Sequence, residues 1–106
     1  MSQQTIISRD EVARRLSVPV RVLVRYEARG LVGVARDGAV EGYAPAEIRR
    51  LSSIVSYQRD LGMNLAGVEA VLKLRAYLAD LHRQLGDLAA RLNEVVADSM
   101  EHDDHA

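Results

Sequence analysis

Apolar positions recur at helical spacing through most of the chain, and turn residues divide them into segments. The first segment opens with the S-x-x-E form of a capping box, in which Ser8 precedes the helix and Glu11 is the acidic member. A short helix is therefore expected from Arg9. It should end before Pro19, because the residue that precedes a proline disfavours the helical conformation.

A second helix is predicted directly after that turn, since Pro19 suits the start of a helix. Gly30 lies where a left-handed C-cap is expected. The positions at i, i+3, i+4 and i+7 are Val20, Leu23, Val24 and Glu27. The sequence therefore predicts two short helices joined by a tight turn.

A small hairpin is expected next. Residues 31–34 alternate in polarity, residues 36–38 read Arg-Asp-Gly, and residues 40–43 offer a returning strand. The order of helix, turn, helix and hairpin is that of a winged helix-turn-helix.

A third helix is predicted from Pro45, with Glu47 in its first turn, where the helix dipole favours an acid. It should end at Gly62. Asn64 then suits the cap of a further helix, whose buried side chains would be Leu65, Val68, Val71 and Leu72.

The clearest periodicity lies in the last third of the chain. Apolar residues follow Val71 at alternating spacings of three and four, which is the a/d repeat of a coiled coil. They are Leu74, Leu78, Leu81, Leu85, Leu88, Leu92 and Val95. No second heptad segment exists for this seam to pack against, so we expect a homodimer rather than an intramolecular hairpin.

The composition fits a small globular protein with 106 residues, of which 48% are apolar and none is cysteine. Disulfides and thiolate metal sites are thereby excluded, and a reducing, cytoplasmic setting is expected. No apolar run approaches the roughly 20 residues of a membrane span, and the N-terminus lacks the features of a signal peptide. No nucleophile constellation or phosphate-binding loop is present either, so we expect neither an enzyme nor a cofactor.

Charge divides the chain into two halves. Residues 1–50 hold nine arginines against six acids, and residues 51–106 hold five basic residues against nine acids. A solvated surface would explain the arginines of the first two helices, but their number and the absence of lysine favour phosphate contact. The candidates for phosphate contact are Arg14, Arg15, Arg21, Arg25 and Arg29. Tyr26, beside Leu23, is expected in the core.

The predicted organisation has three parts: a winged helix-turn-helix head at residues 1–62, a corner helix and coiled-coil dimerisation helix at residues 63–97, and an acidic flexible tail at residues 98–106. The fold class is mainly α. Histidines and aspartates in the tail could suggest a metal site, but such sites need ligands fixed by structure, so no metal is predicted.

Two stretches resemble the MerR superfamily of regulators. DEVARRLSVPVRVLVRYEARGLV is similar to its N-terminal helix-turn-helix, with the Tyr26-Glu27 and Gly30-Leu31 pairs in the usual places. The run EGYAPAEIRRLSSIVSYQRDLGMNLAGVEAVLKL is similar to two branches of that superfamily. These are the HspR-type heat-shock repressors and the CbpM-type modulators of J-domain co-chaperones.

The repressor resemblance implies a transcription regulator that binds double-stranded DNA at an inverted repeat. It also implies a dimer held by an antiparallel coiled coil, with the second helix of each head in a major groove. That helix would place Arg21 and Arg25 near the DNA, and Arg14 and Arg15 on the first helix would lie near the phosphate backbone. A DnaK-type chaperone would be the regulating partner.

The modulator resemblance implies instead that the scaffold binds a J-domain and does not read DNA specifically. The surface facing the basic helix of a J-domain should be acidic, and the candidate residues are Glu41, Asp80, Asp87 and Glu94. Two features favour this alternative. Val24 stands where MerR relatives usually have an arginine, and the predicted wing carries Glu41 where repressors have arginines.

Overall fold

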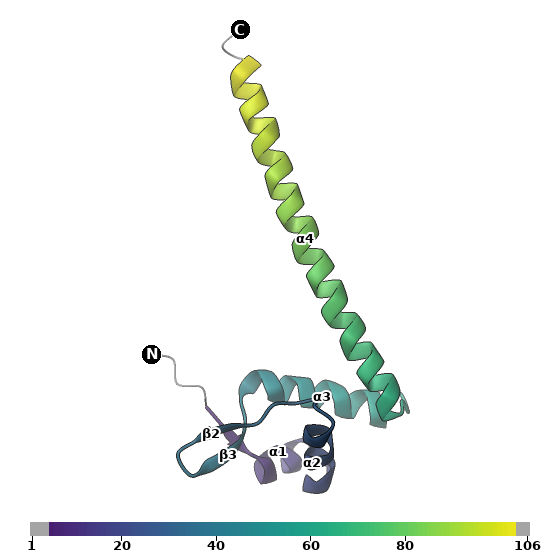
Figure 1. The fold of residues 1–106 in the computed structure, drawn as a ribbon. Coiled ribbons are helices and arrows are strands. Elements are labelled where there is room, and N and C mark those ends of the chain that lie inside the picture. Colours follow the sequence, from purple (N-terminus) through teal and green to yellow (C-terminus); the bar gives the residue numbers. More distant parts are fainter. Residues whose placement is uncertain (1–4, 104–106) are drawn as a thin grey trace. The chain divides into compact units, whose positions relative to one another are not determined.

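The computed structural model describes residues 5–103, with side chains through residue 100. The chain forms two compact units, Met1–Glu69 and Ala70–Ala106, and we call the first of these the head. The described residues form seven elements that follow one another along the chain, and Figure 1 draws them as a ribbon. The predicted division at residues 62 and 97 stays a prediction.

The first two helices are α1 (Arg9–Leu16) and α2 (Val20–Ala28). Ser8 caps α1, because its hydroxyl oxygen accepts a hydrogen bond from the Glu11 backbone N–H at 3.3 Å. Ser17 ends α1 in the left-handed conformation, with φ at 57°. The predicted helix-turn-helix is therefore present, and its boundaries lie close to the predicted ones.

A three-stranded sheet accompanies these helices, in the order β1 (Ile7–Ser8), β3 (Val40–Tyr43) and β2 (Ala35–Asp37). Both pairings are antiparallel. The sequence did not predict β1, which is only 2 residues long. Gly42 is required at this position, because a Cβ atom there would lie 1.9 Å from the Ile7 carbonyl oxygen of β1.

The first strand of the hairpin was predicted wrongly. It occupies Ala35–Asp37 rather than residues 31–34. Leu31 and Val32 are both buried, which an alternating strand with one solvent face does not allow. They follow Gly30, whose φ of 74° turns the chain back onto the core. The hairpin turn therefore falls after Asp37, where Gly38 has a positive φ.

The core of the head lies between the helix-turn-helix, the sheet and α3 (Pro45–Arg59). Tyr26 is buried as predicted, and its hydroxyl lies 2.7 Å from the Gln58 side-chain oxygen on α3. Val24 belongs to the exposed side of α2, although its spacing had grouped it with the buried Leu23. The buried apolar residues of the head are Val12, Ala13, Leu23, Tyr26, Leu31, Val32, Tyr43, Leu51, Ile54, Val55, Leu65 and Val68.

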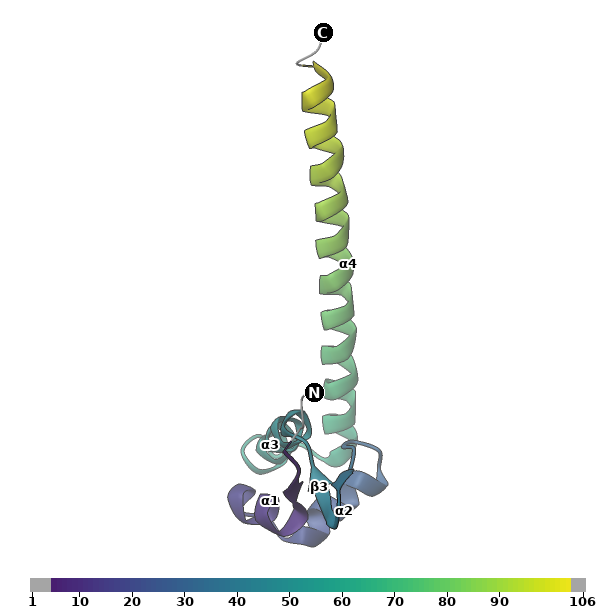
Figure 2. The ribbon, with the colours of Figure 1, turned by 90° about the vertical axis from the view of Figure 1, so that its left-hand side faces the viewer.

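The last element is α4 (Leu65–Asp103), a single helix of 39 residues (Figure 2). The expected corner helix and coiled-coil helix are thus continuous. Asn64 caps α4 as predicted, since its side-chain oxygen accepts a hydrogen bond from the Gly67 backbone N–H at 2.8 Å. No helix in the described part of the chain is long and apolar enough to span a membrane.

Candidate nucleic-acid interface

The exposed face of α2 carries two arginines. Arg21 and Arg25 lie one turn apart, on the side of α2 opposite the buried Leu23 and Tyr26. Within residues 5–100, the ion pairs of the head are made by other arginines. Both guanidinium groups are therefore available to a ligand.

The N-terminus of α2 is also unusual among the head helices. Its N-cap residue is Pro19, which offers no side-chain hydrogen bond, and its first turn contains no acid. By contrast, α1 has Asp10 and Glu11 in its first turn, and α3 has Glu47. A helix N-terminus carries partial positive charge, so Arg21 in the first turn increases the attraction for an anion.

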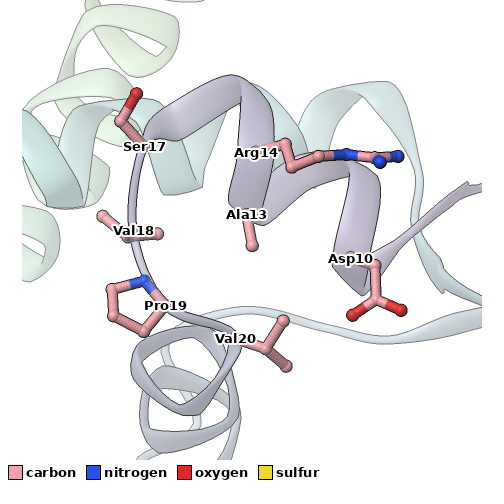
Figure 3. Close-up of a pocket in the computed structure, with 7 residues that line it drawn as sticks. All are labelled: Asp10, Ala13, Arg14, Ser17, Val18, Pro19 and Val20. Atoms are coloured by element: carbon pink, nitrogen blue, oxygen red, sulfur yellow. The ribbon is translucent and has the colours of Figure 1, made fainter.

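An open hollow of about 660 Å³ lies beside this N-terminus (Figure 3). Figure 3 shows Ser17, Val18 and Pro19 in the turn between α1 and α2, and the Arg14 and Asp10 side chains extending from α1. The hollow therefore brings the start of α2 and the Arg14 side chain to one surface. Its lining residues are Asp10, Ala13, Arg14, Ser17, Val18, Pro19 and Val20.

Arg14 and Arg15 both pair with Glu11 on the surface of α1. The hydrogen bond from Arg14, followed by that from Arg15, holds the pKa of the Glu11 carboxyl below its usual value. Both arginine side chains remain more than half exposed. Solvent-exposed pairs of this kind are weak, so phosphate groups can compete with Glu11 for these guanidinium groups.

A second group of charges joins the wing to the helices, and we call it the Arg9 cluster: Arg9, Glu27, Arg36, Glu41 and Tyr43. Arg9 donates to Glu27 of α2 through Nε at 2.7 Å and through Nη2 at 2.9 Å. It also donates to Oε1 of Glu41 at 2.6 Å. Arg36 donates to the other oxygen of Glu41 at 2.6 Å, and the Tyr43 hydroxyl donates to Glu27. One guanidinium thus connects α1, α2 and β3.

The Arg9 cluster changes the electrostatics of the wing. Hydrogen bonds from Arg9 hold the pKa values of Glu27 and Glu41 below their usual values, and Arg36 adds to the effect on Glu41. Burial, together with the bond to Glu27, raises the pKa of Tyr43. Glu41 is therefore an ionised carboxylate whose two oxygens each accept from an arginine.

Three further arginines hold the head together. Arg29, on the C-terminal side of α2, forms an ion pair of 2.8 Å with Glu69 on α4. Arg50 donates to the Leu31 carbonyl oxygen. Arg59 donates to the carbonyl oxygens of Leu16 and Ser17 at 2.8 and 3.0 Å, where α1 ends. These contacts support the fold, and none of them involves Arg21 or Arg25 of α2.

The predicted coiled-coil seam lies along α4. Six of its seven members after Val71 are at least half exposed, and Leu81 is partly buried. A hollow of about 360 Å³ is lined by Leu81, Leu85 and Leu88 together with neighbouring polar side chains. Such a hollow has the form of the hole that accepts a knob residue from a partner helix.

The acidic residues assigned to the alternative J-domain site do not share one environment. Glu41 lies in the Arg9 cluster. On α4, Asp80 accepts hydrogen bonds from Arg83 at 2.9 Å and from Gln84 at 3.2 Å. Asp87 and Glu94 are exposed. The side chains of the predicted histidine and aspartate tail lie outside the described residues.

The sequence identified the arginine face of α2 but missed the Arg9 cluster. The partners of Arg9 are 18 and 32 residues away along the chain. Only the pairing of β3 with β1 brings Glu41 close to the start of α1. The local signal in this region was the capping box at Ser8. It predicted that the helix begins at Arg9, but it gave no information about the ion-pair partners of Arg9.

Comparison with known proteins agrees with this geometry. A family described as MerR HTH family regulatory protein matches residues 7–74, which include the helix-turn-helix, the wing, α3 and the start of α4. The chain belongs to the MerR family.

A Streptomyces coelicolor protein that carries the name heat shock protein HspR is 30% identical over 95 residues. The match covers 88% of this chain and 63% of that relative, so the chain spans less than two thirds of its length. No solved structure matches. As a member of the MerR family, the chain is a regulator of the helix-turn-helix type.

Proposed function

We propose that this MerR-family regulator is an HspR-type repressor that binds an inverted-repeat operator as a dimer. Each head would insert α2 into the major groove, with Arg21 and Arg25 contacting bases and nearby phosphates. Arg14 and Arg15 would contact the DNA backbone from α1. By analogy with the repressor branch, the genes controlled would encode chaperones.

The observation that carries this proposal is the exposed face of α2. It carries two arginines that form no ion pair within residues 5–100. Arg25 lies in the last turn of α2, whereas Arg21 lies at its N-terminus, which has no side-chain cap and no acid. In the free protein, a cation at this end of a helix is unfavourable by a few tenths to about 1 kcal/mol. A phosphate anion at the same place converts that repulsion into attraction.

The state of Glu41 favours DNA over a J-domain as the partner. Because Arg9 and Arg36 occupy both of its oxygens, the charge of Glu41 is compensated within the head. The wing then presents a neutralised carboxylate and the largely exposed Arg36 side chain rather than a free acid. The repulsion expected between an acidic wing and phosphate groups is correspondingly reduced.

The dimer would form through the exposed seam of α4, from Leu74 to Val95. An unpartnered stripe of leucines over this length is a typical interface, because a helix with such a face buries it against another helix. A second copy of the chain carries the same stripe. A symmetric pair of heads would then match an inverted repeat.

The first test is binding of the purified chain to fragments from upstream of its own gene, by fluorescence anisotropy over a salt series. Nanomolar affinity for one fragment, with a steep loss as salt rises, is expected for arginine-phosphate contacts. Arg21→Ala and Arg25→Ala should each lower affinity for that fragment by about 5- to 150-fold, the range for loss of a good base contact.

Arg83→Ala is the matched control, since it removes the same charge from α4 and should leave operator affinity unchanged. If both α2 variants bind like the unchanged protein, α2 does not read the DNA. If all fragments bind weakly and alike, the repressor proposal fails.

The J-domain alternative has its own measurement. Asp87 and Glu94 remain exposed on α4 and could face a basic helix. The modulator reading predicts that a purified J-domain binds the chain saturably and that the double variant Asp87→Asn/Glu94→Gln loses this binding. It also predicts that the chain shows no operator specificity. These results together would favour the modulator over the repressor. A DnaK-type chaperone would be titrated in parallel into the protein–operator complex.

A further inference from the structure

The exposed face of α2 contains two apolar side chains beside its two arginines. Residues 21, 24, 25 and 28 share this face, and the two that are not arginines are Val24 and Ala28. Val24 is 47% exposed, whereas Leu23 beside it is fully buried. The face carries no amide, hydroxyl or carboxylate. Its chemistry is therefore limited to two guanidinium groups and two small apolar groups.

We propose that Val24 reads the 5-methyl group of a thymine in the major groove, beside a guanine read by Arg21. The proposal rests on the proposed DNA-binding function. Each base edge requires a particular partner: arginine suits guanine, asparagine or glutamine suits adenine, and an acid suits cytosine. With only guanidinium and apolar groups on this face, guanine edges and thymine methyl groups are the features that it can distinguish.

The spacing along α2 fits adjacent base pairs. Arg21 and Val24 are three residues apart, which corresponds to about 4.5 Å along a helix axis. Successive bases of a DNA strand are about 3.4 Å apart. Residues toward the N-terminus of a recognition helix contact the base edges, and Arg21 and Val24 are the second and fifth of the 9 residues of α2. Ala28, on the same face, adds no bulk that would hold the helix away from the bases.

A protein partner fits this surface less well. Val24 is a neighbour of Arg21 on the helix surface, because the two are three residues apart, so an apolar protein contact over Val24 would also cover that cation. Desolvating charges without partners is unfavourable. The major groove offers both kinds of group together, because phosphates and guanine edges satisfy the arginines while a thymine methyl packs on the valine.

The test compares thymine with deoxyuridine, which lacks only the 5-methyl group. Duplexes that bind the full chain are first selected from a random library, and each thymine of the selected half-site is then replaced in turn. One replacement should weaken binding about fourfold per half-site, as expected for one methyl group left unburied. Val24→Ala should lose that sensitivity, so that the two duplexes bind within twofold of each other.

Val34→Ala is the matched control. Val34 is an exposed valine outside α2, at 41% exposure, and this variant should keep the full response to deoxyuridine. Far-ultraviolet circular dichroism checks that the variants fold alike.

The possible failures are distinguishable. If selection enriches a sequence but no thymine position responds, or if Val24→Ala still responds, the role of Val24 is overturned while DNA recognition stands. If no sequence is enriched, the proposed function fails as well. If the chain enriches no DNA sequence and Val24→Ala weakens its binding to a J-domain, the exposed face of α2 is a protein-binding surface, and the role of Val24 in reading thymine is overturned.

Discussion

Glu27 is the most enclosed carboxylate of the Arg9 cluster, and its replacement by glutamine tests whether that cluster holds the head together. Its side chain is 15% exposed. It accepts two hydrogen bonds from Arg9 and one from Tyr43. Glutamine has nearly the same shape, but it is neutral and has only one acceptor oxygen. Glu27→Gln therefore removes the paired contact with Arg9 while leaving the packing in place.

The expected loss follows from the surroundings of this pair. A hydrogen bond to a charged group contributes about 1.5–3 kcal/mol, and breaking a fully buried ion pair costs about 3–5 kcal/mol. Arg9 is 26% exposed and keeps its bond to Glu41, so the lower part of these ranges applies. We expect Glu27→Gln to lower the free energy of unfolding by about 2 kcal/mol. For a head of this size the melting temperature should fall by about 8–16 °C.

Urea denaturation at pH 7 and fixed protein concentration measures this change. Tyrosine fluorescence is the suitable probe, because Tyr26 and Tyr43 are buried in the head. Glu11→Gln is the matched control. Glu11 also binds two arginines but is 37% exposed, so its loss should leave the midpoint unchanged. If the midpoint of Glu27→Gln moves no further than that of the control, the Arg9 cluster does not stabilise the head.

Three further predictions concern the Arg9 cluster, the close approach at Gly42 and the seam of α4. The carboxyl groups of the Arg9 cluster have lowered pKa values in the folded state, so their stabilisation is present at neutral pH. It should be lost as the pH falls below about 4, and a urea midpoint that rises on acidification would contradict this. Gly42→Ala should destabilise the head by about 1–3 kcal/mol, because the new Cβ atom meets backbone of β1. By comparison, Gly86→Ala on α4 meets open space and should not destabilise the protein; equal urea midpoints for the two variants would refute the steric argument. Replacing Leu81 and Leu85 with aspartate should give monomers by light scattering, and an unchanged mass would show that the seam is not the interface.

Local signals predicted most of the helical architecture. The capping box at Ser8 and the cap at Asn64 both form as the sequence indicated, because each depends only on residues three positions away. Gly30, which has a positive φ, likewise lies just after the end of α2, as predicted. These features are encoded within a single turn of chain, so periodicity and turn chemistry are sufficient to find them.

Long-range pairing explains what the sequence did not predict. The strand β1 exists only because Ile7 pairs with Tyr43. The first strand of the hairpin was misplaced because Leu31 and Val32 are buried in the core of the head and do not form one face of a strand. For the candidate site, the arginines of α2 were singled out by the number of arginines in the first two helices, and their role there stays a prediction. The compensation of Glu41 was not, because no local pattern relates it to Arg9.

Under the proposed function, the Arg9 cluster also bears on how the bound DNA would behave. Because one guanidinium joins α1, α2 and the hairpin strand β3, α2 and the wing are held together within the head. A rigid DNA-binding head requires the DNA duplex to bend or twist to fit it. The free energy of bending and twisting DNA depends on its base steps. Operator preference should therefore extend to base pairs that no side chain touches, with flexible pyrimidine–purine steps favoured where the groove must conform to the head.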